Sequence, residues 1–350
     1  MSNPERIRYQ HSSLARRVQS RLNPWLLRLA ARRAAGIEQT LVVAGSPRSG
    51  TTWLAELVSA LPGAAVLFEP LQANEIPEAR SRGFHRGTCL LPGQDDARKQ
   101  DYLELALRGE VRNHWTTSRI SLWEAARHRV WSVKFVHANL LLGWLCDRFP
   151  VRPPALIIRH PCAVVASQLK MWQAHCWRDE EREEFLEFRP EFRPLVDALQ
   201  SPAQRLAAIW CMEQWLPLSH PRPWPFQLVC YERLVRRGAD ELERLLAGWD
   251  LPLTSAALER LGVASTTTQR DSHLLRRGDP LAAWRKMLDR TQVAQILEVV
   301  AAFGLDFYTE ALEPDYERLE GTGRVITSLP AALPSFPFPS TTPSSPSNPV

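Results

Sequence analysis

One stretch of the chain decides the fold, and it reads Leu41-Val42-Val43-Ala44-Gly45-Ser46-Pro47-Arg48-Ser49-Gly50-Thr51-Thr52. Its four leading apolar residues predict a short buried strand, and apolar positions recur at helical spacing from Trp53 to Val58. Between strand and helix, Gly45 and Gly50 give the G-x-x-x-x-G spacing of a phosphate loop, with Thr52 at its Ser/Thr position. Such a loop points backbone N–H groups inward at the positive end of a helix, so we expect it to bind an anion.

The loop departs from that of a nucleoside triphosphatase at one position. A triphosphatase carries a lysine there, which reaches the β and γ phosphates of its substrate. This chain has Thr51 at that position and its cation earlier, at Arg48. The loop therefore suits a single 5′-phosphate whose leaving oxygen needs one fixed positive partner. A nucleotide or small-molecule kinase using the same loop remains the alternative.

Strands and helices alternate along the rest of the chain. Four more short apolar runs predict strands, at residues 64–68, 130–135, 155–158 and 226–230. Residues 139–148 and 162–172 follow two of these strands with helical patterns, and residues 177–200 predict a helical insertion rich in charge and phenylalanine. Residues 285–303 predict a late amphipathic helix. This alternation predicts an α/β fold with a central, mainly parallel sheet flanked by helices.

The two ends of the chain differ from this middle part. Residues 1–36 hold eight arginines and a single acid, which predicts a basic N-terminal arm. Two interpretations of the arm stay open: peripheral contact with an acidic membrane or a partner, or packing on the domain with the arginines solvated. Residues 327–350 are rich in Pro and Ser and predict a disordered tail, because they bury too little apolar surface to order themselves. One domain is expected over residues 37–326.

The composition fits a globular protein of the cytoplasm. The 350 residues are 45% hydrophobic, with a net charge of +5. No run of about 18 apolar residues could span a bilayer, and the first residues lack the apolar region of a secretory signal. The six cysteines form no C-x-x-C pair, which argues against a zinc knuckle or a disulfide framework and favours free thiols.

A second anion-binding position follows the strand at 155–158. Arg159 ends this strand, and Pro161 stands at the first position of a helix, where proline is tolerated. Ser167 comes about two helical turns later, so it can converge with Arg159 on one phosphate.

The two positions together resemble motifs of one enzyme family. Pro47 to Leu54 resembles the 5′-phosphosulfate-binding motif of the sulfotransferases that use 3′-phosphoadenosine-5′-phosphosulfate (PAPS), and Arg159 with Ser167 is similar to their 3′-phosphate-binding motif. Tyr231-Glu232-Arg233-Leu234 resembles their Tyr-Glu-Asp-Leu segment, with Arg233 in place of the usual acid. Arg276-Arg277-Gly278, followed by Trp284, loosely resembles the C-terminal loop that closes over the 3′-phosphate.

This resemblance spans roughly residues 39–310 and carries expectations about fold and chemistry. It implies a phosphate-loop (P-loop NTPase-like) fold related to nucleotide kinases, and transfer of a sulfuryl group from PAPS to an acceptor hydroxyl or amine. It further implies release of 3′,5′-diphosphoadenosine (PAP) and no metal requirement. The residues implied to hold the donor are Ser46, Pro47, Arg48, Ser49, Gly50, Thr51, Thr52, Arg159, Ser167, Arg277 and Gly278.

Two side chains are candidates for the base that takes the acceptor proton. Phe68-Glu69-Pro70 is similar to a segment of carbohydrate sulfotransferases, and Glu69, 21 residues past Arg48, matches the base of tyrosylprotein sulfotransferases. His137 follows Lys134 by three residues, whereas cytosolic sulfotransferases carry Lys-x-His, so His137 is out of register. We expect Glu69 to be the base, with His137 as the alternative, and Lys134 to steady the sulfuryl group or the leaving phosphate.

The acceptor is left open by the sequence. A small molecule, a lipid or a carbohydrate would each suit the tryptophans of residues 73–129 and 173–225, which are expected to line the acceptor side. The likeness at Phe68-Glu69-Pro70 favours a carbohydrate. The other alternative is a non-enzymatic basic scaffold acting through residues 1–36. No nucleic-acid-binding motif is recognisable, so a nucleic acid partner is not expected.

Overall fold

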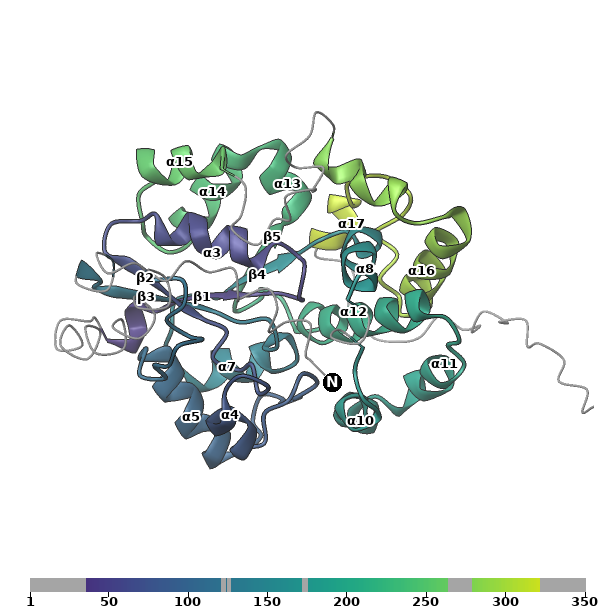
Figure 1. Ribbon diagram of the computed structural model, residues 1–350, viewed down its shortest axis with the longest axis horizontal. Helices are drawn as coiled ribbons and strands as arrows, with labels where there is room; N and C mark the ends of the chain where they lie inside the picture. The colour runs from purple at the N-terminus through teal and green to yellow at the C-terminus, as the bar shows by residue number, and fades with distance from the viewer. Residues whose placement is uncertain (1–35, 121–123, 125–126, 172–175, 264–278, 322–350) are drawn as a thin grey trace, which may run out of the picture.

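The computed structural model describes residues 36–120, 124, 127–171, 176–263 and 279–321 (Figure 1). The predicted tail, and the predicted basic arm apart from Gly36, therefore lie outside the described residues. Within the described ranges, five strands form one sheet in the order β2-β3-β1-β4-β5, with every neighbouring pair parallel. This topology confirms the predicted α/β fold with a parallel central sheet.

All five strands were predicted from the sequence. They are β1 (Leu41–Ala44), β2 (Ala64–Phe68), β3 (Val130–Lys134), β4 (Ala155–Ile158) and β5 (Gln227–Cys230). Only β3 and β5 differ from the prediction, each by one residue at one end. Because all strands run the same way, their carboxyl ends lie along one edge of the sheet. The strand order reverses at β1, which is the place where ligands bind in doubly wound sheets.

Helices cover both faces of the sheet. Successive strand residues point to opposite faces, so Val43 joins a core beneath one helical layer while Val42 joins a core beneath the other. The first layer holds α3 (Thr51–Ser59), α13 (Tyr231–Arg236), α14 (Gly238–Ala247) and α15 (Ser255–Leu261) (Figure 1). The second holds α4 (Pro77–Ser81), α5 (Ala97–Leu107), the 3₁₀ helix η3 (Asn139–Leu141) and α7 (Leu142–Arg148).

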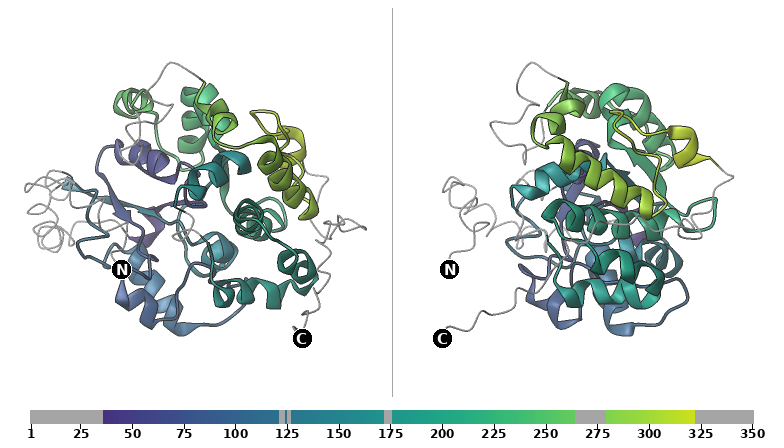
Figure 2. Two further views of the ribbon diagram at one scale, coloured as in Figure 1. Left: turned by 45° about the vertical axis from the view of Figure 1, so that its right-hand side comes forward. Right: turned by 90° about the vertical axis from the view of Figure 1, so that its right-hand side faces the viewer.

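A third group of helices packs beside the β4–β5 end of the sheet. Its members in the shared core are α8 (Pro161–Leu169), α12 (Pro202–Leu218) and α16 (Arg290–Ala302). Helices α12 and α16 lie side by side in Figure 1 and in both turned views of Figure 2. The predicted helical insertion is confirmed by α10 (Asp179–Phe188) and α11 (Arg193–Asp197). In the described part of the chain, no helix has the length and apolar character needed to cross a membrane.

The late helix begins later than the sequence pattern indicated. Residues 285–303 were expected to be one helix, but Pro280–Lys286 form the 3₁₀ helix η6 and α16 starts only at Arg290. The side chain of Asp289 accepts a hydrogen bond from the Gln292 backbone at 2.8 Å, and Gln292 reciprocates in a capping box. This cap fixes the helix start. The helix predicted over 162–172 begins at Pro161 and ends at Leu169.

Candidate functional site

The phosphate loop joins β1 to α3 at the carboxyl edge of the sheet. The Ser49 N–H bonds the Ser46 carbonyl at 3.1 Å, so the chain turns back on itself before α3 begins. Gly50 has a φ of 97°, and a Cβ built on it would lie 2.6 Å from the ring of Tyr231. Gly50 therefore satisfies both a left-handed backbone and a close approach, which another residue could not do without strain.

The two predicted anion-binding stretches meet in the structure. The Arg48 Nε donates to the Ser167 hydroxyl at 2.9 Å, and the Arg159 Nη1 donates to the Arg48 carbonyl at 3.1 Å. Gln168, next to Ser167 in α8, donates to the Pro47 carbonyl at 3.0 Å. Three side chains from the end of β4 and from α8 thus hold the phosphate loop. Arg48 also has a φ of 75°, an uncommon conformation for a residue with a side chain.

The segment after β5 supports Arg159. The guanidinium carbon of Arg159 lies 4.1 Å from the centre of the Tyr231 ring, and the Trp210 indole donates to the Arg159 carbonyl at 3.2 Å. Glu232 accepts from the His160 N–H at 2.8 Å and from the Tyr308 hydroxyl at 3.0 Å. Tyr231 and Glu232 therefore fix the strand end that carries Arg159.

His160 is held as a neutral, buried ring. Burial lowers its pKa to about 4, its Nδ1 accepts from the Cys162 N–H at 3.1 Å, and Trp284 stacks on it with ring centres 4.9 Å apart. The C-terminal segment thus reaches the neighbourhood of Arg159 through Trp284. The predicted donor residues Arg277 and Gly278 lie outside the described residues.

Glu69 and Lys134 form an ion pair at the ends of β2 and β3. The Lys134 Nζ bonds the Glu69 carboxylate, while the Glu69 N–H bonds the Lys134 carbonyl at 2.9 Å. Lys134 is 1% exposed, and burial lowers its pKa although Glu69 opposes the shift. Glu69 has a φ of 46°, so Arg48 and Glu69 are two of three non-glycine residues with positive φ in the described part of the chain. Such outliers persist where the surrounding structure enforces them.

Arg119 is a third cation beside the Glu69–Lys134 pair, after Lys134 and Arg48, and no motif in the sequence marks it. The guanidinium carbon of Arg119 lies 5.1 Å from the centre of the Phe68 ring, and the Lys134 Nζ lies 4.5 Å from the same centre. The charges of Arg119 and Arg48 both act on Lys134 and lower its pKa further. Three cations and the Glu69 carboxylate therefore converge beside the phosphate loop.

His137 lies farther along the chain from β3. It is 7% exposed and stands two residues before η3, in the turn that follows the strand end. The short polar contact at the end of β3 joins Lys134 to Glu69. His137 follows Lys134 by three residues and not by two, so it comes later in the chain than the Glu69–Lys134 ion pair.

The buried polar atoms without a hydrogen-bond partner among the described residues include two donors of the anion-binding stretches. They are the Ser49 hydroxyl of the phosphate loop and the Arg159 Nε. Buried donors are rarely left unpaired, because desolvation without a bond is costly. Their position on the loop and at the strand end fits an anion that accepts from both stretches.

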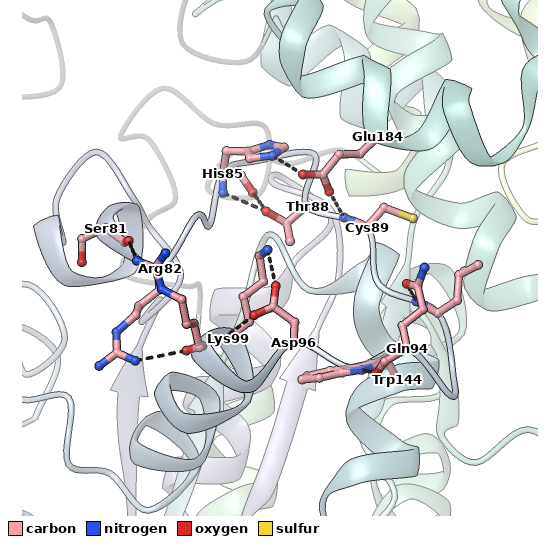
Figure 3. Close-up of polar contacts among 12 residues, drawn as sticks. Ser81, Arg82, His85, Thr88, Cys89, Gln94, Asp96, Lys99, Trp144 and Glu184 are labelled. Carbon is pink, nitrogen blue, oxygen red and sulfur yellow. Dashed lines mark hydrogen bonds and ion pairs between the residues drawn. The ribbon is translucent and has the colours of Figure 1, made fainter.

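Hydrogen bonds join residues 85–89 to the insertion helix α10, and together they form a clasp between these two segments. Glu184 accepts from the His85 ring at 2.7 Å and from the Cys89 N–H at 2.7 Å, as Figure 3 shows. Glu181 accepts from two nitrogens of Arg86, at 3.1 and 2.8 Å. The two segments expected to line the acceptor side are therefore joined by the hydrogen bonds that Glu181 and Glu184 accept.

The described residues contain no group of three or more His, Cys, Asp or Glu side chains placed to hold a metal ion. All six cysteines, which lie in the described part of the chain, are free. Burial raises the pKa of the thiols of Cys89, Cys146 and Cys162 to about 12, so these three stay protonated at neutral pH.

Comparison with known proteins assigns the family. No curated protein sequence matches the chain. Solved structures that match it include the sulfotransferase domain of the Synechococcus PCC 7002 olefin synthase (19% identity, 78% of this chain and 95% of that one, TM-score 0.41). Sulfotransferase STF9 from Mycobacterium avium matches with 16% identity over 85% of this chain and 83% of that one, with a TM-score of 0.43. Mouse sulfotransferase SULT7A1 complexed with PAP matches with 13% identity over 79% of this chain and 88% of that one, with a TM-score of 0.41. The sulfotransferase family model matches residues 40–255, which include the loop, the Glu69–Lys134 pair and Arg159 with Ser167. The chain therefore belongs to the sulfotransferase family, whose members are enzymes that use PAPS.

Proposed function

We propose that this enzyme transfers the sulfuryl group of PAPS to an acceptor hydroxyl or amine and releases PAP. One observation carries the proposal: Arg48 of the phosphate loop bonds Ser167 of α8 at 2.9 Å, so the two anion-binding stretches form one continuous surface. A donor with phosphates at both its 5′ and 3′ positions needs two such stretches at once. A nucleoside triphosphate needs only the first stretch, together with a lysine that this loop lacks.

The donor is held by the two stretches in different ways. Backbone N–H groups of the loop and of the start of α3 surround the 5′-phosphate, apart from Pro47, which has no N–H, and Ser49, whose N–H bonds the Ser46 carbonyl. Arg48 adds a cation at the oxygen that carries the sulfuryl group. Arg159 and Ser167 bind the 3′-phosphate, with the unpaired Arg159 Nε and the Ser49 hydroxyl as further donors.

The chemical step is an in-line displacement at sulfur. The acceptor oxygen or nitrogen forms a bond to sulfur on one side, while the bond from sulfur to the 5′-phosphate oxygen breaks on the other. The acceptor proton passes to the Glu69 carboxylate, acting as general base. The electron pair of the broken bond stays on the phosphate of PAP, where Arg48 and Lys134 offset the growing negative charge.

The Glu69–Lys134 pair supports this division of roles. Lys134 holds Glu69 in place at the strand ends, and its buried ammonium is the cation nearest to the base. As charge moves from the acceptor to the leaving phosphate, the ammonium offsets the negative charge that grows on the phosphate oxygens. Arg119 shares the Phe68 ring with Lys134 and adds positive potential to the same point.

The acceptor side is formed by residues 85–89 and α10, which the hydrogen bonds of Glu181 and Glu184 hold together. A carbohydrate hydroxyl is the acceptor that the Phe68-Glu69-Pro70 segment favours. The clasp sets the shape of this side and so contributes to the choice of acceptor.

The function is tested by mass spectrometry of an acceptor panel incubated with PAPS and the enzyme in metal-free buffer. The panel holds sugars, tyrosyl peptides, lipids and small alcohols. We expect a mass gain of one SO₃ group on at least one acceptor, with formation of PAP. A kinase would instead be stabilised by ATP with magnesium and not by PAP in a thermal-shift assay, and this result would contradict the proposal.

A further inference from the structure

A residue of α8 sets the orientation of one peptide group in the phosphate loop. The Gln168 side-chain amide donates to the Pro47 carbonyl at 3.0 Å, and Gln168 is 2% exposed. The proline ring fixes the φ of Pro47 at about −65°, so rotation about its Cα–C bond is the backbone freedom that remains. This rotation turns the Pro47 carbonyl. Gln168 therefore fixes the one backbone angle that the proline ring leaves open.

The two peptide groups on either side of the Arg48 Cα are held separately. Gln168 bonds the carbonyl before it, and the Arg159 Nη1 bonds the carbonyl after it at 3.1 Å. Because each peptide group is planar, these two bonds together determine both backbone angles of Arg48. Its φ of 75° costs a residue with a side chain free energy and persists only where its surroundings enforce it. The bonds from Gln168 and Arg159 supply that enforcement.

The loop just before Pro47 is fixed by a second helix. Gln214 of α12 is fully buried, and its side-chain amide donates to the Ser46 hydroxyl at 2.6 Å. Helices α8 and α12 pack against each other. Ser46 and Pro47 are therefore each bonded to a helix of the same packed pair, which keeps the peptide group after Pro47 in place relative to the rest of the loop.

The Gln168 amide is only partly satisfied. Its nitrogen must face Pro47, because the carbonyl there offers an oxygen. Its Oε1 is buried and has no hydrogen-bond partner among the described residues. A buried polar atom without a partner lowers stability, and a methionine of similar size would avoid this cost. The bond to Pro47 is thus what distinguishes glutamine from an apolar residue at this position.

The direction of the Arg48 N–H follows from this bond. The peptide bond between Pro47 and Arg48 is trans, so its C=O and N–H point in opposite directions. We propose that Gln168 is a positioning residue for the 5′ half of the donor site: by holding the Pro47 carbonyl, it directs the Arg48 N–H to the 5′-phosphate. The inference rests on the proposed function, in which N–H groups of the loop surround that phosphate. Arg48 then binds the donor with its backbone as well as its side chain.

Calorimetric titration of the full chain with PAP and with 5′-AMP, in metal-free buffer, tests this role in wild type and Gln168→Met. Methionine is similar in size but has no donor for the Pro47 carbonyl. Both ligands carry the 5′-phosphate, so we expect both affinities to fall by a similar factor, about tenfold. The ratio of the two affinities should stay as in wild type. A loss confined to PAP would place the effect of Gln168 at the 3′-phosphate, beside Ser167, and would overturn the positioning role.

Gln227→Met is the matched control. The Gln227 side-chain amide also donates to a backbone carbonyl, that of Leu245 in α14, at 3.2 Å. Gln227 is the first residue of β5, so it lies at the edge of the sheet opposite the phosphate loop. We expect Gln227→Met to bind PAP and 5′-AMP as wild type does. If it weakens both ligands as much as Gln168→Met does, a general loss of stability explains both variants and the inference is overturned.

A second measurement observes the Arg48 N–H itself and needs only wild type. The sequence contains two Pro–Arg pairs, Pro47-Arg48 and Pro221-Arg222. Labelling proline with ¹³C at the carbonyl and arginine with ¹⁵N therefore selects the NMR signals of these two amides. On addition of 5′-AMP, the Arg48 amide proton should shift downfield because it bonds the phosphate, while that of Arg222 should not move. The absence of a downfield shift at saturating 5′-AMP would overturn the inference, even if Gln168→Met does not fold.

The outcomes separate this inference from the proposed function. If wild type binds PAP more tightly than 5′-AMP and Gln168→Met binds both as wild type does, the positioning role is overturned while the proposed function stands. If wild type binds 5′-AMP but gains nothing from the 3′-phosphate of PAP, the proposed function fails, and the response of Gln168→Met to 5′-AMP still decides the positioning role. If wild type binds neither ligand, both fail.

Discussion

The Arg48 guanidinium donates to the Ser167 hydroxyl at 2.9 Å, although 119 residues separate them in the chain. This bond joins the strand-to-helix turn after β1 to the helix after β4, across the point where the strand order reverses. It places a cation between the two halves of the proposed donor site. In the proposed function, Arg48 both contacts the donor and connects the two stretches that bind it.

Replacing Arg48 by alanine should therefore harm binding and turnover together. Loss of a charged hydrogen-bond donor is expected to weaken PAP binding by about 10- to 100-fold, and to lower kcat because the leaving phosphate loses its cation. The measurements are calorimetry with PAP and steady-state rates with PAPS. Arg48→Lys, which keeps the charge but not the fork of donors, should fall between wild type and Arg48→Ala. PAP affinity equal to wild type in Arg48→Ala would contradict this role.

Replacing Glu69 by glutamine should separate binding from chemistry. The side chain keeps its size, so PAP affinity should stay within a few-fold of wild type, while turnover falls by about 10²- to 10⁴-fold if a general base is lost. Single-turnover rates at saturating PAPS measure the effect. Full turnover in Glu69→Gln would show that the carboxylate is not the base.

His137 supplies the matched comparison. If Glu69 is the base, His137→Ala should lower turnover far less than Glu69→Gln does, because His137 lies beyond the Glu69–Lys134 pair along the chain. The opposite ranking of the two variants would assign the proton transfer to His137.

The clasp between residues 85–89 and α10 depends on one glycine. A Cβ built on Gly87 would lie 1.7 Å from the Glu181 carbonyl oxygen, a backbone atom that cannot move aside cheaply. We expect Gly87→Ala to lower the free energy of unfolding by about 1–3 kcal/mol through overpacking. Gly262→Ala is the control, since its nearest such contact is 3.7 Å and its φ of −74° suits any residue. Equal melting temperatures for the two variants would argue against a tight clasp.

Stability should fall in mild acid because His160 is buried as a neutral ring. Its pKa is about 4 in the folded chain against an ordinary value of 6.5, so the unfolded chain binds the extra proton between these values. The free energy of unfolding then falls with decreasing pH across this window, by up to about 1.4 kcal/mol per pH unit. Chemical denaturation of wild type and His160→Gln measures the difference. A pH dependence that is the same in both would contradict it.

Much of the fold was predictable because it is encoded locally. The β1 run, the glycine spacing and the helix after it specify a strand, a turn and a helix within twenty residues. The approach of the loop at 46–52 to the stretch at 159–167 also followed from the sequence, since parallel strands place their carboxyl ends at one edge. The start of α16 could have been found from Asp289 and Gln292, which have the spacing of a capping box.

Other parts of the site depend on packing between distant elements. Gln214 meets Ser46 only because α12 lies against the phosphate loop, 168 residues along the chain. Arg119 lies against the Phe68 ring, whose centre is also close to the Lys134 Nζ. No periodicity or spacing in the sequence specifies these contacts, because each depends on how a helix or loop docks and not on its own pattern.

The proposed function depends most on one donor being held at both its ends, and the calorimetric comparison of PAP with 5′-AMP tests this directly. The two ligands differ only in the 3′-phosphate. We predict that wild type binds PAP at least about tenfold more tightly than 5′-AMP in metal-free buffer. Arg159→Ala combined with Ser167→Ala should remove that preference while 5′-AMP binding is retained. Equal affinities of wild type for the two ligands, or a preference that survives the double substitution, would contradict the account.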